Sequence, residues 1–165
     1  VYKRQLFDAQ PEQIVFTMNA THALNMAIRT LVSPGDRVLI SGFEHNAVVR
    51  PLYALGAETV IAGRALFDPD DTLRAFRERL DGGIRAVVCT HVSNVFGYIL
   101  PIGKIAALCR ERGVPLIVDN TFPTPVNCRP FEWGADIVTH STTKYMDGHG
   151  AAPVSYTHLT LPTIA

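Results

Sequence analysis

Residues that suit phosphate binding and reaction with a carbonyl group gather near the end of the chain. Lys144 follows Ser141 and Thr143 at the end of an apolar run, which sets an amine beside hydroxyl groups that can hold a phosphate. The free amine of a lysine is a nucleophile toward an aldehyde, so Lys144 is the candidate for covalent catalysis. Asp119 ends another apolar run, where burial of a carboxylate needs a cation or a proton donor. A protonated pyridine nitrogen would meet that need.

Three polar segments earlier in the chain are weaker candidates. Asn19-Ala20-Thr21 precede a helical pattern, and a helix N-terminus with a hydroxyl can bind a phosphate, although this segment alone favours a simple N-cap by Asn19 or Thr21. His45 suits stacking on an aromatic ligand or proton transfer, with a surface or capping histidine as the alternative. Asn94 suits hydrogen bonding to a ligand oxygen, with a turn residue as the alternative.

These candidates follow strands in a pattern that alternates with helices. Continuous apolar strands between amphipathic helices predict an α/β fold with a mostly parallel, doubly wound sheet in three α/β/α layers, with ligands at the carboxyl ends of the strands. The expected strands are Ile14–Thr17, Val38–Ser41, Thr59–Ala62, Ala86–His91, Leu116–Asp119 and Asp136–Ser141. The expected helices are Thr21–Leu31, Ala47–Leu55, Asp71–Leu80 and Pro101–Arg112, the third capped by Asp70 or Asp71 and the fourth ended by Gly113.

Composition narrows the classes of function. The 165 residues fit one domain, and 15 basic residues balance 15 acidic ones without clusters, which disfavours nucleic acid and anionic membranes as partners. No apolar stretch is long enough to span a bilayer, and no signal peptide is present, so we expect a cytoplasmic protein. The three cysteines lack metal-ligand spacing, so we expect buried, reduced thiols and no metal site.

Both ends of the chain differ from the rest. Val1–Gln5 and Ser155–Ala165 resemble translated adapter sequence, so we expect them to be non-native, with frayed natural termini as the alternative. The expected domain, a truncated large domain, is therefore residues 6–154.

From about residue 6 to residue 119, the chain resembles the class V aminotransferase family, especially its cysteine desulfurase branch. Pyridoxal 5'-phosphate (PLP) is the cofactor of that family. The resemblance implies that Thr21, with Asn19 and Ala20 beside it, binds the cofactor phosphate, that His45 stacks on the pyridine ring, and that Asn94 contacts cofactor and substrate. It rests on the segments Asn19–Thr21, Glu44–Pro51 and Thr90–Gly97.

From residue 118 onward, the chain resembles the Cys/Met-metabolism enzymes, which include O-acetylhomoserine sulfhydrylase, cystathionine γ-synthase and the γ-lyases. The segments Val118–Phe122 and Gly134–Tyr145 carry this resemblance. It implies that Asp119 pairs with the pyridine nitrogen. It also implies that Ser141 and Thr143 hold the phosphate and that Lys144 forms the Schiff base with the cofactor.

Each half departs from the pattern of the other family. A desulfurase would have Gln where Phe122 stands and His where Thr143 stands, whereas a Cys/Met-metabolism enzyme would stack a Tyr where His45 stands. We therefore expect a chimera joined around Val114–Asp119, with a natural hybrid as the alternative.

The expected function is that of a fragment of a PLP enzyme acting on a small sulfur-containing amino acid. The main expectation is a cysteine desulfurase or class V aminotransferase, and the alternative is a sulfhydrylase or cystathionine γ-synthase, whose parent enzymes are homo-oligomers. A non-functional chimeric product is a third possibility. A dinucleotide-binding domain is disfavoured because no G-x-G-x-x-G motif follows a strand.

Overall fold

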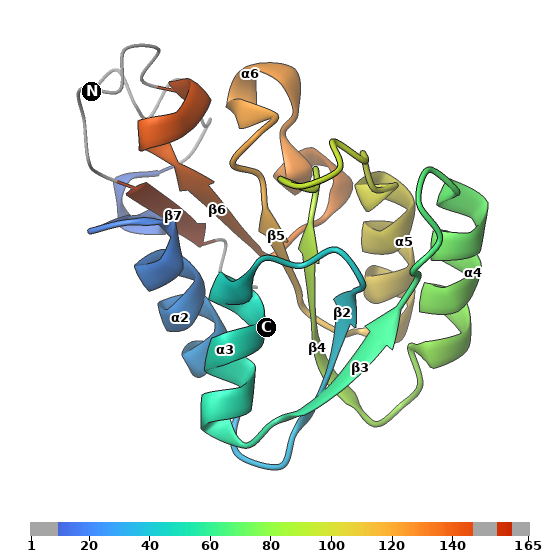
Figure 1. Ribbon diagram of the computed structural model, residues 1–165. Coiled ribbons are helices and arrows are strands. Elements are labelled where there is room, and N and C mark those ends of the chain that lie inside the picture. The colour runs from blue at the N-terminus through green and yellow to red at the C-terminus, as the bar shows by residue number, and fades with distance from the viewer. Residues whose placement is uncertain (1–9, 147–154, 160–165) are drawn as a thin grey trace.

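The computed structural model describes residues 10–146 and 155–159, which form one sheet with the strand order β1-β7-β6-β5-β4-β2-β3 (Figure 1). The five strands from β6 to β3 pair in parallel, whereas β7 is antiparallel to both β1 and β6. The bounds are β1 Ile14–Thr17, β2 Arg37–Ser41, β3 Glu58–Ala62, β4 Ile84–Thr90, β5 Leu116–Asp119, β6 Ile137–Ser141 and β7 Ser155–Leu159.

Helices cover both faces of this sheet. Figure 1 shows α2 and α3 on one face and α4 and α5 on the other, so the predicted three-layer α/β fold is confirmed. The helices are α2 Ala20–Leu31, α3 Asn46–Leu55, α4 Pro69–Arg79 and α5 Ile102–Arg112, with a short α6 Thr124–Asn127 and the turns η1 Pro11–Gln13, η2 Pro130–Trp133 and η3 Thr142–Met146.

Two apolar cores hold the three layers together. Consecutive residues of a strand face opposite sides, so Val38 packs against α2 and α3 while Leu39 packs against α4 and α5. Full burial of one large apolar side chain stabilises the fold by about 1.5–3 kcal/mol. The largest fully buried apolar side chains are Leu24, Ile28, Leu39, Leu52, Phe76, Leu80, Leu100, Ile102, Ile105, Leu116 and Ile117. The sheet is therefore a firm base for the loops at its carboxyl edge.

The helix boundaries correct two expectations. The N-cap of α4 is Asp68, whose Oδ1 accepts a hydrogen bond from the Asp71 backbone N–H at 2.8 Å, so neither Asp70 nor Asp71 caps the helix. The helix begins at Pro69 because a proline in the first turn removes only an N–H that has no intrahelical partner. Pro101 precedes α5 rather than opening it.

The last described residues belong to the sheet. Residues 155–159, which the sequence sets apart as non-native, form β7 between β1 and β6. Their foreign origin stays a prediction, but the backbone of this segment supplies hydrogen bonds to both neighbouring strands. The other expected non-native residues, 1–5 and 160–165, lie outside the described residues.

The cysteines agree with expectation, since Cys89, Cys109 and Cys128 are buried and free. Within the described ranges, no helix is long and apolar enough to cross a membrane. The same residues contain no group of His, Cys, Asp and Glu side chains arranged to hold a metal ion.

Candidate active site

A cavity of about 360 Å³, here named the strand-end cavity, lies where β4, β5 and β6 end and α2 and α3 begin. All nine predicted site residues line it, although 125 positions separate the first from the last. A few hundred cubic ångströms is the size expected of a small-molecule site. The lining residues are Asn19, Ala20, Thr21, Leu24, His45, Ala47, Thr90, Asn94, Asp119, Thr121, Phe122, Ser141, Thr143 and Lys144.

One side of the cavity is suited to an anion. Asn19 caps α2 by accepting a hydrogen bond from the His22 backbone N–H at 2.8 Å, which confirms the capping interpretation. The backbone N–H groups of Ala20 and Thr21 have no partner among the described residues. Such unpaired N–H groups at the positive end of a helix dipole favour a phosphate.

Two hydroxyl groups on the η3 side add further donors. The Ser141 Oγ and Thr143 Oγ1 atoms lie 3.0 Å apart and hydrogen-bond to each other, and both residues line the strand-end cavity. Thr142, between them, is buried, and its Oγ1 has no partner within the described part of the chain. Hydroxyl groups that bond only to each other can turn toward a ligand oxygen.

Asp119 lies at the end of β5 with one oxygen committed and one available. Its Oδ1 accepts hydrogen bonds from the Thr121 hydroxyl at 2.6 Å and from the Thr121 N–H at 3.1 Å. Its Oδ2 accepts none from the described residues. Burial raises the pKa of Asp119, while the Thr121 hydrogen bonds and the nearby His45 ring lower it. A cation or a protonated ring nitrogen at Oδ2 would favour the ionised form.

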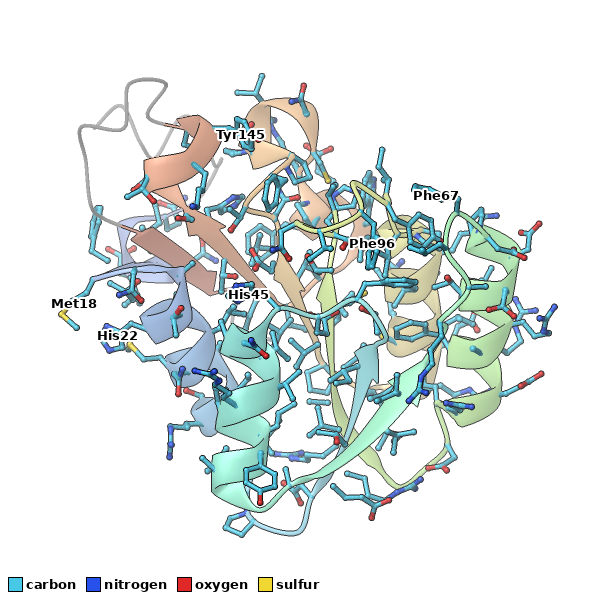
Figure 2. The ribbon with its side chains drawn as sticks, in the orientation of Figure 1. Met18, His22, His45, Phe67, Phe96 and Tyr145 are labelled. Carbon is cyan, nitrogen blue, oxygen red and sulfur yellow. The ribbon has the colours of Figure 1, made fainter. Side chains whose placement is uncertain are left out.

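The His45 ring is held by the helix that it caps. Its Nδ1 accepts a hydrogen bond from the Ala47 backbone N–H at 3.0 Å, so the neutral ring carries its proton on Nε2. Figure 2 shows His45 at the start of α3, and its side chain lines the strand-end cavity. The capping role that was the alternative for His45 is therefore confirmed, and the hydrogen bond holds the ring at the strand-end cavity.

Glu44 lies behind the strand-end cavity and was not predicted. Its Oε1 accepts a hydrogen bond from the Thr90 N–H at 2.8 Å and another from the Ser41 hydroxyl, while its buried Oε2 has no partner among the described residues. Burial raises the pKa of Glu44 to about 8, and the negative charge of Asp119 adds to this shift. A neutral Glu44 thus joins the ends of β2 and β4 beneath the loop that carries His45.

Lys144 lies on η3, the turn that follows β6. Its backbone angles, φ −93° and ψ −106°, interrupt the turn, and its side chain is exposed at the strand-end cavity. Together with the anion side and the Asp119 oxygen, this amine gives the cavity donors for a phosphate, a nucleophile for an aldehyde and a partner for a ring nitrogen. This set of groups fits PLP.

The sequence missed two polar residues of this site. Thr121 orients Asp119 and also accepts a hydrogen bond from the Ser141 N–H at 3.1 Å, which ties β5 to β6. A hydroxyl residue two positions after an acidic residue at a strand end is a turn signal that could have indicated it. Glu44 follows the neutral residues Ser41–Phe43, so its charge was visible in the sequence. Its hydrogen-bond partner Thr90 is 46 positions away, so its role was not.

Comparison with known proteins gives a family match over most of the chain. The family model for the Cys/Met metabolism PLP-dependent enzyme matches residues 8–154. A cystathionine beta-lyase from Coxiella burnetii is 30% identical over 148 residues, covering 90% of this chain and 38% of that protein. A homocysteine synthase from Schizosaccharomyces pombe is 35% identical over 141 residues, covering 82% of this chain and 32% of that protein. The chain thus spans 32–38% of the length of these curated relatives.

Solved structures agree in fold. A crystal structure from Campylobacter jejuni, of a protein assigned as an O-acetylhomoserine (thiol)-lyase and carrying N'-pyridoxyl-lysine-5'-monophosphate, superposes with a TM-score of 0.77 at 26% identity. The superposition covers 90% of this chain and 36% of that protein. The metB protein from Corynebacterium glutamicum gives a TM-score of 0.82 at 22% identity, over 96% of this chain and 40% of that one.

These matches change the expectation for the front half of the chain. The family match runs without a break across residues 114–119, where we expected a join, and includes the segments that resemble class V aminotransferases. Neither the class V resemblance nor a chimera is supported by these matches, and the Cys/Met-metabolism alternative fits better than a cysteine desulfurase.

Proposed function

Because this chain belongs to the Cys/Met metabolism PLP-dependent enzyme family, we propose that it forms the cofactor-binding part of an enzyme acting on a small sulfur-containing or γ-substituted amino acid. The proposed reaction type is elimination or replacement of a side-chain substituent, as in sulfhydrylases and cystathionine γ-synthases. One observation carries the proposal: a single cavity is lined by the amine, the carboxylate, the hydroxyls and the helix N-terminus that such a cofactor requires.

Bound PLP supplies an aldehyde that condenses with amines and a ring that accepts electrons. In the proposal the chain's own residues do the rest. The Lys144 amine would hold the cofactor through its aldehyde and, when free, would take the proton from the substrate α-carbon. Asp119 Oδ2 holds a proton on the ring nitrogen, and Thr121 keeps that carboxylate in position through Oδ1.

The remaining lining residues hold the ligand in place. The α2 N-terminus at Ala20 and Thr21 and the hydroxyls of Ser141 and Thr143 bind the phosphate. His45 stacks on the ring, and the Asn94 amide donates to an oxygen of cofactor or substrate. These roles are proposals that rest on the residue types and on their shared cavity.

A cysteine desulfurase has no comparable support. The family match favours the Cys/Met-metabolism enzymes instead, and the three cysteines of this chain are buried and do not line the strand-end cavity. Burial also raises the pKa of Cys109 to about 12 and that of Cys128 to about 11, which disfavours the thiolate.

Exchange of the substrate α-proton tests the proposal, because it measures the proton transfer that is assigned to Lys144. The protein is incubated in D₂O with PLP and either O-acetylhomoserine or cysteine, and loss of the α-proton signal is followed by NMR. We expect exchange with O-acetylhomoserine to fall about 10²–10⁴-fold in Lys144→Ala, the usual contribution of a general base. Equal exchange rates in the original protein and in Lys144→Ala would contradict the role of Lys144. Faster exchange with cysteine would favour the desulfurase instead.

A further inference from the structure

A second hollow adjoins the strand-end cavity. This groove of about 560 Å³, named the His91 groove, is lined by His91, Val92, Gly97, Ile99, Phe122, Pro123, Asn127, Cys128, Trp133 and Tyr145. Phe122 lines both hollows, and its ring lies 5.5 Å from that of Tyr145, the residue after Lys144. Figure 2 shows Tyr145 on η3 beside α6. A ligand in the His91 groove would therefore lie next to the proposed cofactor.

The hydrogen bonds of Asn120 fix the proton of the His91 ring. The Asn120 Nδ2 group donates to the backbone oxygens of Cys128 at 2.9 Å and Thr124 at 3.3 Å, so the oxygen of this amide is the atom that faces His91. His91 Nδ1 lies 3.0 Å from that Oδ1. Because an amide oxygen only accepts, Nδ1 must carry the proton and Nε2 must carry the lone pair.

The His91 side chain presents this lone pair to the groove. The residue is 93% buried, and within the described part of the chain the only hydrogen bond of its ring is the one to Asn120. Nδ1 points inward to Asn120, which leaves Nε2 on the groove side of the ring. The Trp133 ring packs edge-on against the imidazole at 5.8 Å and limits its rotation. Burial lowers the pKa of His91, which favours the neutral ring.

The lining of the His91 groove restricts what it can bind. The described residues that line it include no Asp, Glu, Lys or Arg, so a charged ligand would lose hydration there without a charged partner among them. Its aromatic and aliphatic walls favour an apolar body, and Nε2 requires one hydrogen-bond donor. A thiol meets both demands better than an alcohol, because an S–H group has little hydration to lose and sulfur packs well against aromatic rings.

We propose that the His91 groove binds a small neutral thiol whose S–H group donates to His91 Nε2. Binding as such is independent of the cofactor. As the nucleophile of a replacement reaction, the thiol sulfur would bond to the substrate side-chain carbon that has lost its substituent to solvent, and the S–H proton would pass to His91 Nε2. This use rests on the proposed function, and Phe122 is the side chain that lines both hollows.

The test is a titration of the protein without PLP, in a phosphine reductant that contains no thiol. 1-Propanethiol is added, and the ring Cε1–H signal of His91, identified by its absence in His91→Phe, is followed by NMR. We expect saturation with a dissociation constant on the order of 1–10 mM, within the limit for so small a ligand. 1-Propanol should bind at least about 10-fold more weakly, and 3-mercaptopropionate, which is charged, weaker still.

Two variants separate the site from general binding. Ile99→Trp fills the groove at an exposed position and should weaken 1-propanethiol binding about 10-fold without unfolding the protein. His91→Phe lacks the reporter signal, so its affinity is followed through the line width of the 1-propanethiol methyl signal; it should fall by a similar factor while the apolar walls are kept. The proposal is overturned if the His91 signal does not shift, if the alcohol binds as tightly as the thiol, or if neither variant matters. Since no PLP is present, failure here leaves the proposed function standing, and failure of PLP binding leaves this result standing.

Discussion

The strand-end cavity and the His91 groove share Phe122 but differ in almost every other respect. The cavity takes its side chains from strand ends and from helix N-termini, and it is lined by hydroxyl, amide, carboxylate and amine groups. The groove takes its side chains from the loop after β4, from α6 and from η2, and its lining is mainly apolar. The edge of one parallel sheet thus offers a site for a charged ligand and, beside it, a site for a neutral one.

Buried polar groups explain why the two hollows differ. Asp119 and Glu44 are both partly buried acids, but Asp119 has an oxygen available to a ligand at the cavity whereas Glu44 is turned toward Ser41 and Thr90. At the groove, Asn120 uses both ends of its amide and leaves one acceptor, His91 Nε2. Hydrogen-bond partners, more than residue type, decide which groups remain available to a ligand.

The largest expected effect comes from removing the charge in the strand-end cavity. Asp119→Asn keeps the shape of the side chain but cannot hold a positive ring nitrogen. PLP-dependent exchange of the substrate α-proton should therefore fall about 10²–10³-fold. Thiol binding in the His91 groove should stay within about 2-fold, and Asp70→Asn, at an exposed position in α4, is the matched control. Equal losses at both hollows would break the distinction between them.

The next largest effect is the dependence of stability on pH that comes from Glu44. The folded protein keeps Glu44 protonated up to its pKa of about 8, whereas the unfolded chain releases this proton near pH 4.5. Stability from this group is therefore complete below pH 4.5 and is lost as pH rises through 8. Glu44→Gln mimics the neutral form, so its stability relative to the original protein should grow by about 1.4 kcal/mol per pH unit between pH 5 and 8.

Denaturant unfolding at several pH values measures this change. Glu78→Gln, at an exposed position of α4, is the control and should run parallel to the original protein. Parallel curves for Glu44→Gln as well would mean that Glu44 is ionised in the folded state.

The smallest effect concerns the shared wall. Phe122 is half-buried, so Phe122→Ala should lower the free energy of unfolding by about 1–2 kcal/mol, less than for a fully buried ring. Loss of aromatic contact should weaken PLP and 1-propanethiol by about 10-fold each, as direct titrations would show. Phe67→Ala, before α4 and outside both hollows, should change neither affinity (Figure 2). Weaker binding of only one of the two ligands would contradict the role of Phe122 as a wall shared by both hollows.

Local patterns in the sequence were enough to predict the sheet and the residues at its edge. The strand Leu116–Asp119 matches its predicted bounds, and Gly113 ends α5 with a positive φ of 64°, as only a glycine does readily. The start of α4 was predicted too late because Pro69, a strong first-turn residue, was overlooked. The strand Ser155–Leu159 was missed because this segment was set aside for its tag-like composition.

Contacts between distant residues were beyond reach of the sequence. Glu44 meets Thr90 across 46 positions, and His91 meets Asn120 across 29, only because β2, β4 and β5 are neighbours in the sheet. The tautomer of His91 follows from its contact with Asn120, and the raised pKa of Glu44 follows from burial in the assembled sheet. They therefore could not be assigned until strand order and register were known.

Covalent capture of the cofactor tests the central claim most directly. The protein is incubated with PLP and reduced with borohydride, and the modified lysine is mapped by mass spectrometry. Lysine occurs only at positions 3, 104 and 144, so the assignment is unambiguous. We predict stoichiometric modification of Lys144 alone, lost in Lys144→Ala. Modification spread over all three lysines, or none at all, would contradict the strand-end cavity as a PLP site.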